Sequence, residues 1–121
     1  MRVLPVQVGA HAGVGPLLAQ AQALRAAWNT VQRPVWIAAS THAGEDESVL
    51  AAHHLLLQQQ PQALLILVPR HPERFASVQQ LCVKEGFTTC RRSQGEAPDA
   101  ATQVLLGDTM GELLLLYALA D

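Results

Sequence analysis

Three short polar segments of this chain carry residues that could bind a ligand, and each directly follows an apolar run. They are Ser40-Thr41-His42, Pro69-Arg70-His71 and Gly107-Asp108-Thr109-Met110-Gly111-Glu112. Arg70 stands between Pro69 and Pro72, which stiffen the turn, so its guanidinium is held where it could clamp an anionic ligand. If a helix begins at Thr109, the N–H groups that follow it would be free to donate to the same ligand. These residues indicate binding of an anionic ligand.

Each segment also has a purely structural interpretation. Thr109 and Glu112 have the spacing of a capping box. Ser40 and Thr41 could cap the helix expected directly after them. The acidic first turn of that helix suits the helix dipole and would repel a phosphate, which places an anion elsewhere. Arg70 could be an ordinary surface arginine, so both interpretations stay open at this point.

Other common site chemistries are not supported by the residue spacing. Gly9, Gly13 and Gly15 precede a helix, but their spacing is wrong for a dinucleotide-binding loop, and no Gly-Lys-Ser/Thr sequence occurs. His53 and His54 are adjacent on an expected helix and so point about 100° apart, which does not suit a shared metal ion. No nucleophile elbow is present for serine-histidine-acid catalysis. We therefore expect no metal.

An alternation of apolar runs and helical patterns must position the three polar segments. The expected strands are residues 35–39, 64–68, 87–90 and 103–106, and the expected helices are residues 16–29, 44–59, 72–84 and 109–120. Strands that are apolar on both faces predict an α/β fold with a parallel sheet covered on both sides. Right-handed crossovers favour a doubly wound, Rossmann-like sheet in the spatial order 3-2-1-4. That order would place segments 40–42 and 107–112 at the point where the strand order reverses.

Length and composition bound the classes of protein that this sequence can form. With 121 residues and 13.0 kDa it has room for one domain, expected over residues 16–121 after an irregular lead-in over residues 1–15. A net charge of -2 and 4% aromatic residues argue against nucleic-acid binding. The longest uncharged apolar run, Leu113–Ala120, is far shorter than the roughly 20 residues that span a bilayer. Cys82 and Cys90 fit no metal or disulfide pattern, as expected of reduced thiols in a cytoplasmic protein.

The strings STHAGEDE, LVPRHPERF and GDTMGEL, within the stretch from Arg33 to Asp121, resemble the Kdo (3-deoxy-D-manno-octulosonic acid) transferases of lipopolysaccharide assembly. The resemblance implies the C-terminal half of a GT-B glycosyltransferase, in which two Rossmann-like domains face each other across a cleft. It also implies transfer of Kdo from CMP-Kdo to a lipid A precursor at the cytoplasmic face of the bacterial inner membrane. In this family the C-terminal domain holds the CMP portion of the donor, and no cofactor is implied.

Carried over residue by residue, the resemblance implies contacts to CMP from five positions. They are Pro69, Arg70, Met110, Gly111 and Glu112. Pro69 and Met110 would offer apolar surface to the cytosine, and Arg70 would offer charge. The N–H groups of Met110 and Gly111 would donate hydrogen bonds, and Glu112 would accept one from a ribose hydroxyl. Four neighbours are further candidate contacts: Ser40, Thr41, His71 and Thr109.

The resemblance also implies that several parts of such an enzyme lie outside the matched stretch. The family's catalytic glutamate, membrane anchor and acceptor site belong to its N-terminal domain, and part of the CMP site follows the position of Asp121. We therefore expect a partial donor-binding domain that is inactive alone, with an uncovered sheet edge beside strand 103–106 through which it could self-associate. The alternative hypothesis is a stand-alone, non-catalytic α/β module that binds a nucleotide or another protein.

Overall fold

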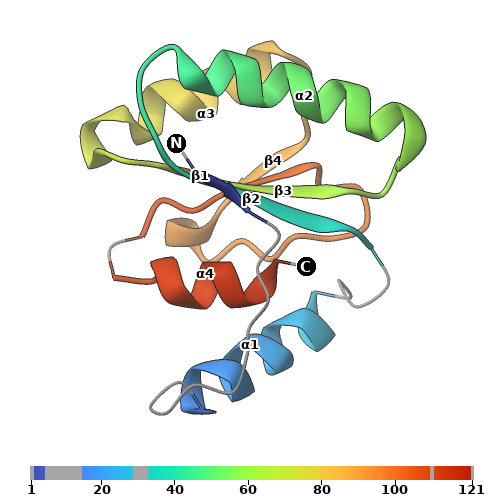
Figure 1. Cartoon of the computed structure of the whole chain (residues 1–121), viewed down its shortest axis with the longest axis vertical. Coiled ribbons are helices and arrows are strands. Elements are labelled where there is room, and N and C mark those ends of the chain that lie inside the picture. Colours follow the sequence, from blue (N-terminus) through green and yellow to red (C-terminus); the bar gives the residue numbers. More distant parts are fainter. Residues whose placement is uncertain (1, 5–14, 29–32, 110, 121) are drawn as a thin grey trace.

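The computed structural model describes residues 2–4, 15–28, 33–109 and 111–120. Short apolar strands alternate with helices along most of this chain, as Figure 1 shows. In chain order the elements are β1 (Arg2–Leu4), α1 (Gly15–Ala27), β2 (Val35–Thr41), α2 (Glu45–Gln59), β3 (Leu64–Pro69), the 3₁₀ turn η1 (Pro72–Arg74), α3 (Phe75–Lys84), β4 (Thr89–Arg91), the 3₁₀ turn η2 (Arg92–Gln94), β5 (Val104–Leu106) and α4 (Leu113–Leu119). The expected α/β fold class is confirmed.

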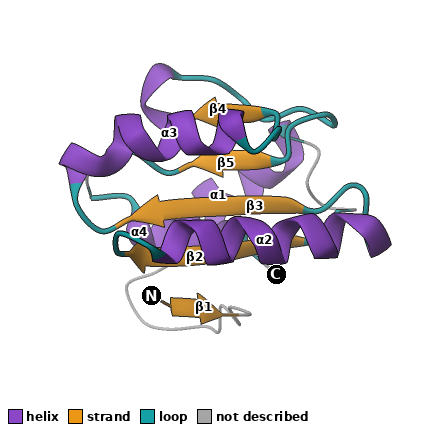
Figure 2. Cartoon of the chain, turned by 90° about the horizontal axis from the view of Figure 1, so that it is seen from above, coloured by secondary structure: helices purple, strands orange, loops and turns teal. Residues whose placement is uncertain are grey.

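The five strands form one sheet in the order β1-β2-β3-β5-β4, which Figure 2 shows from above. β2, β3, β5 and β4 are parallel, with Ile37 opposite Ile66 and Ile66 opposite Leu105. β1 runs antiparallel to β2 at one edge. The expectation that residues 1–15 are irregular is therefore wrong for Arg2–Leu4, while residues 5–14 lie outside the described part of the chain.

The expected strand order 3-2-1-4 is also wrong. The fourth expected strand, β5, lies between β3 and β4 instead of beside β2. The physical reason is burial: all three residues of Val104–Leu106 are fully buried, so this strand suits the interior of the sheet. Thr89 and Arg91 of β4 are partly exposed, and β4 takes the edge. It follows that the uncovered edge expected beside residues 103–106 does not exist there.

Helices cover both faces of the sheet, so that the strands are buried between two layers. In Figure 1, α2 and α3 lie above the sheet, and α1 and α4 lie below it. Leu50 of α2 and Val78 of α3 belong to the apolar cluster on the upper face. Trp28 and Leu116, in or beside α1 and α4, belong to the cluster on the lower face. None of the helices in the described part of the chain has the length and apolar character needed to span a bilayer.

The end of β5 depends on a glycine where α4 approaches the sheet closely. A Cβ on Gly107 would lie 2.8 Å from Leu116 Cδ1 and 2.9 Å from Val68 Cγ2. Both distances are shorter than real Cβ contacts, so any larger residue would push α4 away from β3. Gly107 therefore sets the distance between α4 and the carboxyl edge of the sheet.

Candidate functional site

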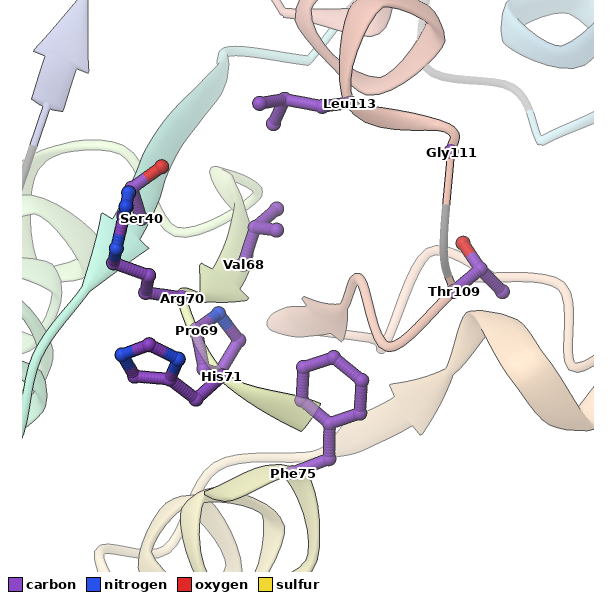
Figure 3. A pocket seen from close by; sticks show the side chains of 9 residues that line it. All are labelled: Ser40, Val68, Pro69, Arg70, His71, Phe75, Thr109, Gly111 and Leu113. Atoms are coloured by element: carbon purple, nitrogen blue, oxygen red, sulfur yellow. The ribbon is translucent and has the colours of Figure 1, made fainter. Parts of the chain in front are cut away.

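The polar segments that follow β2, β3 and β5 surround one pocket at the carboxyl edge of the sheet. Its volume is about 370 Å³, and Figure 3 shows its lining. The lining residues are Ser40, Val68, Pro69, Arg70, His71, Phe75, Thr109, Gly111 and Leu113. In the close-up, Ser40, Arg70 and His71 lie on one side, and Thr109, Gly111 and Leu113 lie on the other. Because β3 lies between β2 and β5, the loop after β3 is at the centre of this site.

Ser40 reaches the pocket because β2 is irregular at its end. Ala39 pairs with Val68 and Thr41 pairs with Pro69, so Ser40 is one extra residue in β2. Its φ of 60° lies in the left-handed region, a conformation that costs a non-glycine residue about 1–3 kcal/mol. Backbone strain of this kind persists only where surrounding contacts impose it, and it re-aims the side chain at that position.

Hydrogen bonds and an ion pair behind the pocket impose this geometry on the ends of β2 and β3. Thr41 Oγ1 donates to Asp46 Oδ1 over 2.6 Å, and Asp46 also forms an ion pair with Arg74. The Thr41 carbonyl accepts from Arg74 Nη1 at 2.7 Å and from the Arg70 N–H at 2.9 Å. Thr41, a candidate ligand contact, is fully buried and is not part of the pocket lining. Its role in the structure is to connect the two strand ends.

The expected capping of α2 by Ser40 or Thr41 is not observed. Gly44 occupies the N-cap position in a left-handed conformation, and no side chain caps it. Glu45 instead reaches back and accepts the His42 N–H over 2.7 Å. The His42 ring lies 6.1 Å from the His71 ring, measured between centroids. The loops after β2 and β3 therefore lie side by side at these two rings.

Asp108, two residues after β5, holds the third loop through hydrogen bonds to its buried carboxylate. Its carboxylate accepts from Arg91 Nε at 2.6 Å, from the Ser93 N–H at 2.7 Å and from Ser93 Oγ at 2.6 Å. Burial alone would raise the pKa of Asp108, but the hydrogen bonds from Ser93 and Arg91 outweigh it and lower the pKa. Asp108 is thus an ionised structural anchor between β4 and β5.

Glu112 is engaged by protein groups, and the expected capping box does not form. Arg92 donates to its two carboxylate oxygens over 3.1 and 3.2 Å, and Thr109 Oγ1 donates over 2.5 Å. The hydrogen bond from Arg92 is the main reason that the pKa of Glu112 is lowered. Helix α4 begins at Leu113, later than the expected start at Thr109, and has no side-chain cap. Glu112 is not among the lining residues of the pocket.

Gly111 precedes α4 instead of lying in its first turn. Its φ is +79°, and a Cβ there would meet nothing within 4 Å, so the backbone conformation alone favours glycine. Met110 lies outside the described residues. Gly111 is not in the first turn of α4, because this helix begins at Leu113.

The structure brings most of the candidate residues together and adds apolar ones that the sequence patterns did not single out. Ser40, Pro69, Arg70, His71, Thr109 and Gly111 share the pocket, whereas Thr41 and Glu112 do not line it. Val68, Phe75 and Leu113 supply apolar surface to it. Leu113 is 37% exposed, so part of its side chain is accessible at the pocket.

Metal binding finds no support in the described part of the chain, where no group of three or more histidine, cysteine or acidic residues could hold an ion. His53 is fully buried and accepts the Trp36 Nε1–H at Nδ1 over 3.1 Å. Its Nε2 therefore carries the proton and donates to the Gln103 carbonyl over 2.8 Å. His53 is a structural residue that connects α2 to β5.

Comparisons with known proteins agree with this architecture. No family model matches the chain. A crystal structure of the C-terminal CMP-Kdo binding domain of WaaA from Acinetobacter baumannii has a TM-score of 0.81 and 42% identity, covering 87% of this chain and 54% of that one. The 3-deoxy-D-manno-octulosonic acid transferase of Haemophilus influenzae is 54% identical over 105 residues. This chain is a homologue of the C-terminal part of the Kdo transferases.

The match to the Kdo transferases is broad, but it covers only part of them. The Haemophilus protein matches 87% of this chain, which extends the resemblance to residues before Arg33. A probable mitochondrial Kdo transferase of Arabidopsis thaliana is 40% identical over 71% of the chain. The chain spans about a quarter of the length of the curated relatives it matches, 24% for Haemophilus and 20% for Arabidopsis.

Proposed function

We propose that this chain binds the CMP portion of CMP-Kdo in the pocket at the carboxyl edge of its sheet. The observation that carries the proposal is the state of Arg70. Its side chain is exposed at the pocket and, within the described part of the chain, has no hydrogen bond or ion pair. By contrast, the following arginines all donate to protein groups: Arg25, Arg33, Arg74, Arg91 and Arg92. A guanidinium with no carboxylate partner is available for a phosphate.

The rest of the pocket suits a pyrimidine nucleotide. Val68, Pro69, Phe75 and Leu113 form apolar surface against which a cytosine ring can pack. We propose Pro69, Arg70, Met110, Gly111 and Glu112 as the main contacts, and the candidates Ser40, His71 and Thr109 as their neighbours on the pocket wall. A ribose contact of Glu112 would replace a bond that it now receives from Arg92 or Thr109. The CMP-Kdo binding domain of the Acinetobacter protein, similar at 42% identity, supports this assignment.

An NMR titration with CMP tests the proposal. The wild-type chain is expected to bind with a dissociation constant of about 1 mM, worth roughly 4 kcal/mol. Arg70→Ala removes a charge-assisted hydrogen bond worth about 1.5–3 kcal/mol and should abolish binding at practical concentrations. Lys84→Ala is the matched control, because it removes an exposed cation from the last turn of α3.

The outcomes of this titration separate the two hypotheses about the chain. Shifts at the pocket that vanish in Arg70→Ala and persist in Lys84→Ala support the CMP site. Equal shifts in wild type and Arg70→Ala would remove Arg70 from the site. A folded wild-type chain with no shifts at all would contradict the proposal and favour a module that binds another protein.

The activity and the cellular place of the whole protein are part of the same proposal. We propose that it transfers Kdo from CMP-Kdo to a lipid A precursor, as a glycosyltransferase at the cytoplasmic face of the inner membrane. The names of the relatives support the transfer of Kdo. Transfer activity would be measured with the full-length protein, by following radiolabelled Kdo into a lipid A precursor.

A further inference from the structure

An ion pair lies directly behind the pocket, where α2, the end of β2 and the turn η1 meet. The Asp46 side chain is 1% exposed and the Arg74 side chain is 18% exposed. Asp46 accepts from Thr41 Oγ1 through one oxygen and from Arg74 Nη2 through the other. Neither residue lines the pocket.

The carbonyl of Thr41 connects this ion pair to the proposed anion-binding residue. It accepts from Arg74 Nη1 over 2.7 Å and from the backbone N–H of Arg70 over 2.9 Å. The position of the Arg70 backbone therefore depends on a carbonyl that Arg74 holds in place. Ser40 directly precedes Thr41, and its left-handed φ of 60° persists only where surrounding contacts impose it. The hydrogen bonds of Thr41 are such contacts.

We infer that Arg74 and Asp46 are positioning residues for the nucleotide site, acting through Thr41 on Arg70 and Ser40. This inference rests on the proposed CMP site. The planar guanidinium of Arg74 spans two acceptors at once, the Thr41 carbonyl and the Asp46 carboxylate. A lysine ammonium at the same position keeps the charge but loses this fixed fork. The end of β2 would then relax, and Arg70 would lose its fixed approach to the ligand.

Arg33 is a matched control, because it lies at the amino ends of the strands, opposite the carboxyl ends that carry the pocket. It is also a buried arginine, and it joins three chain segments by donating to the carbonyls of Gln62, Asp99 and Thr102 over 2.6, 2.8 and 2.6 Å. These carbonyls precede β3 and β5, at the amino ends of the strands. Arg33→Lys therefore weakens a similar buried clamp without touching the pocket.

The experiment measures CMP affinity, stability and the Arg70 amide resonance in Arg74→Lys and Arg33→Lys. We expect Arg74→Lys to weaken CMP binding about threefold to tenfold, the equivalent of about one lost hydrogen bond. The Arg70 amide should shift in the free protein, because its acceptor moves. Arg33→Lys should lower the unfolding midpoint but change the CMP dissociation constant less than twofold.

Three results would overturn the inference. The first is a CMP affinity that does not change in Arg74→Lys. The second is a loss of affinity in Arg33→Lys as large as that in Arg74→Lys, because both losses would then follow from reduced stability. The third is an unmoved Arg70 amide in a folded Arg74→Lys. If Arg74→Lys does not fold, Asp46→Asn replaces it, with the same expected direction and the same contrary results. Failure of the wild-type chain to bind CMP would instead contradict the proposed function, and the inference with it.

Discussion

Arg33 at the amino edge of the sheet and Arg70 at the carboxyl edge are in opposite states. Arg33 is 6% exposed, and its donors are bonded to the backbone carbonyls of three residues. Arg70 is exposed and, among the described residues, its side chain has no bonded partner. The first arginine holds loops together, and the second is the one that we propose as the contact to the ligand.

At the carboxyl edge, Arg74 connects the chain segments, and Arg70 is not needed for these contacts. Arg74 ties the end of β2 to the start of α2, the role that Arg33 has at the other edge. Arg74 is therefore committed to protein groups, while the side chain of Arg70 has no bonded partner among the described residues. Each edge thus has a structural arginine, and the carboxyl edge has the unbonded Arg70 in addition.

Replacing Arg33 should give the largest loss of stability, and it tests whether the two edges of the sheet are independent. Arg33→Ala removes three hydrogen bonds and takes away the donor of the Gln62 and Thr102 carbonyls, whereas the Asp99 carbonyl keeps the Thr102 N–H. We expect the free energy of unfolding to fall by about 3 kcal/mol, measured by urea denaturation. CMP affinity of the folded fraction should stay unchanged, and a parallel loss of affinity would show that the two edges are not independent.

Gly107→Ala tests the carboxyl edge from the side of α4. The added methyl would collide with Leu116 and Val68, and overpacking of this kind costs about 1–3 kcal/mol. Because Val68 lines the pocket, CMP affinity should fall together with stability. Stability from denaturation and affinity from titration would be measured on the same samples. A stable variant with normal affinity would mean that α4 can move without changing the site.

The amino edge should also make the stability of the chain depend on pH, through His53. Burial is the main cause that lowers the pKa of His53, so protonation favours the unfolded chain. Stability should therefore be full above the ordinary histidine pKa and should fall as the pH drops below it, by at most about 1.4 kcal/mol per pH unit. His53→Gln should flatten this part of the stability profile. His54→Gln, an exposed neighbour, should retain it.

Gly111→Ala should have the smallest effect on stability and tests the loop alone. No atom lies where the methyl would go, so only the left-handed backbone opposes it, at a cost of about 1 kcal/mol. CMP shifts at the loop should weaken if Gly111 contacts the ligand. An affinity equal to that of wild type would remove Gly111 from the proposed contacts.

The sequence predicted four of the five described strands and the three loops that line the pocket, because both depend on local patterns. The apolar runs at residues 35–39 and 64–68 lie within β2 and β3, and the loops after them meet at one pocket. The order of the strands depends on burial across the whole sheet. A sequence pattern cannot say whether Val104–Leu106 lies at an edge or between two neighbours, because the connection from β4 contains no long helix.

The residues that support the site were harder to predict than those that line it. Glu45, Asp46 and Glu47 look equivalent in sequence, as the acidic first turn of a helix. Only Asp46 is fully buried, because η1 brings Arg74 beside it. Similarly, Thr109 and Glu112 have the spacing of a capping box, but the Glu112 carboxylate accepts hydrogen bonds from Arg92 of η2. Both outcomes depend on contacts between distant segments.

The interior position of β5 has a consequence for how the chain folds. β4 pairs with β5 alone among the described strands, although β5 follows it in the chain. During synthesis, residues 89–91 therefore have no sheet to join until residues 104–106 have emerged, and the two strands must be added together. β1 and β2 can pair before β3 has emerged, and β2-α2-β3 is the first parallel unit able to form. β4 can join the sheet only after β5 has extended it. The addition of β4 and β5 to the sheet is therefore a late and long-range step of folding. The pocket wall that follows β5 forms with it.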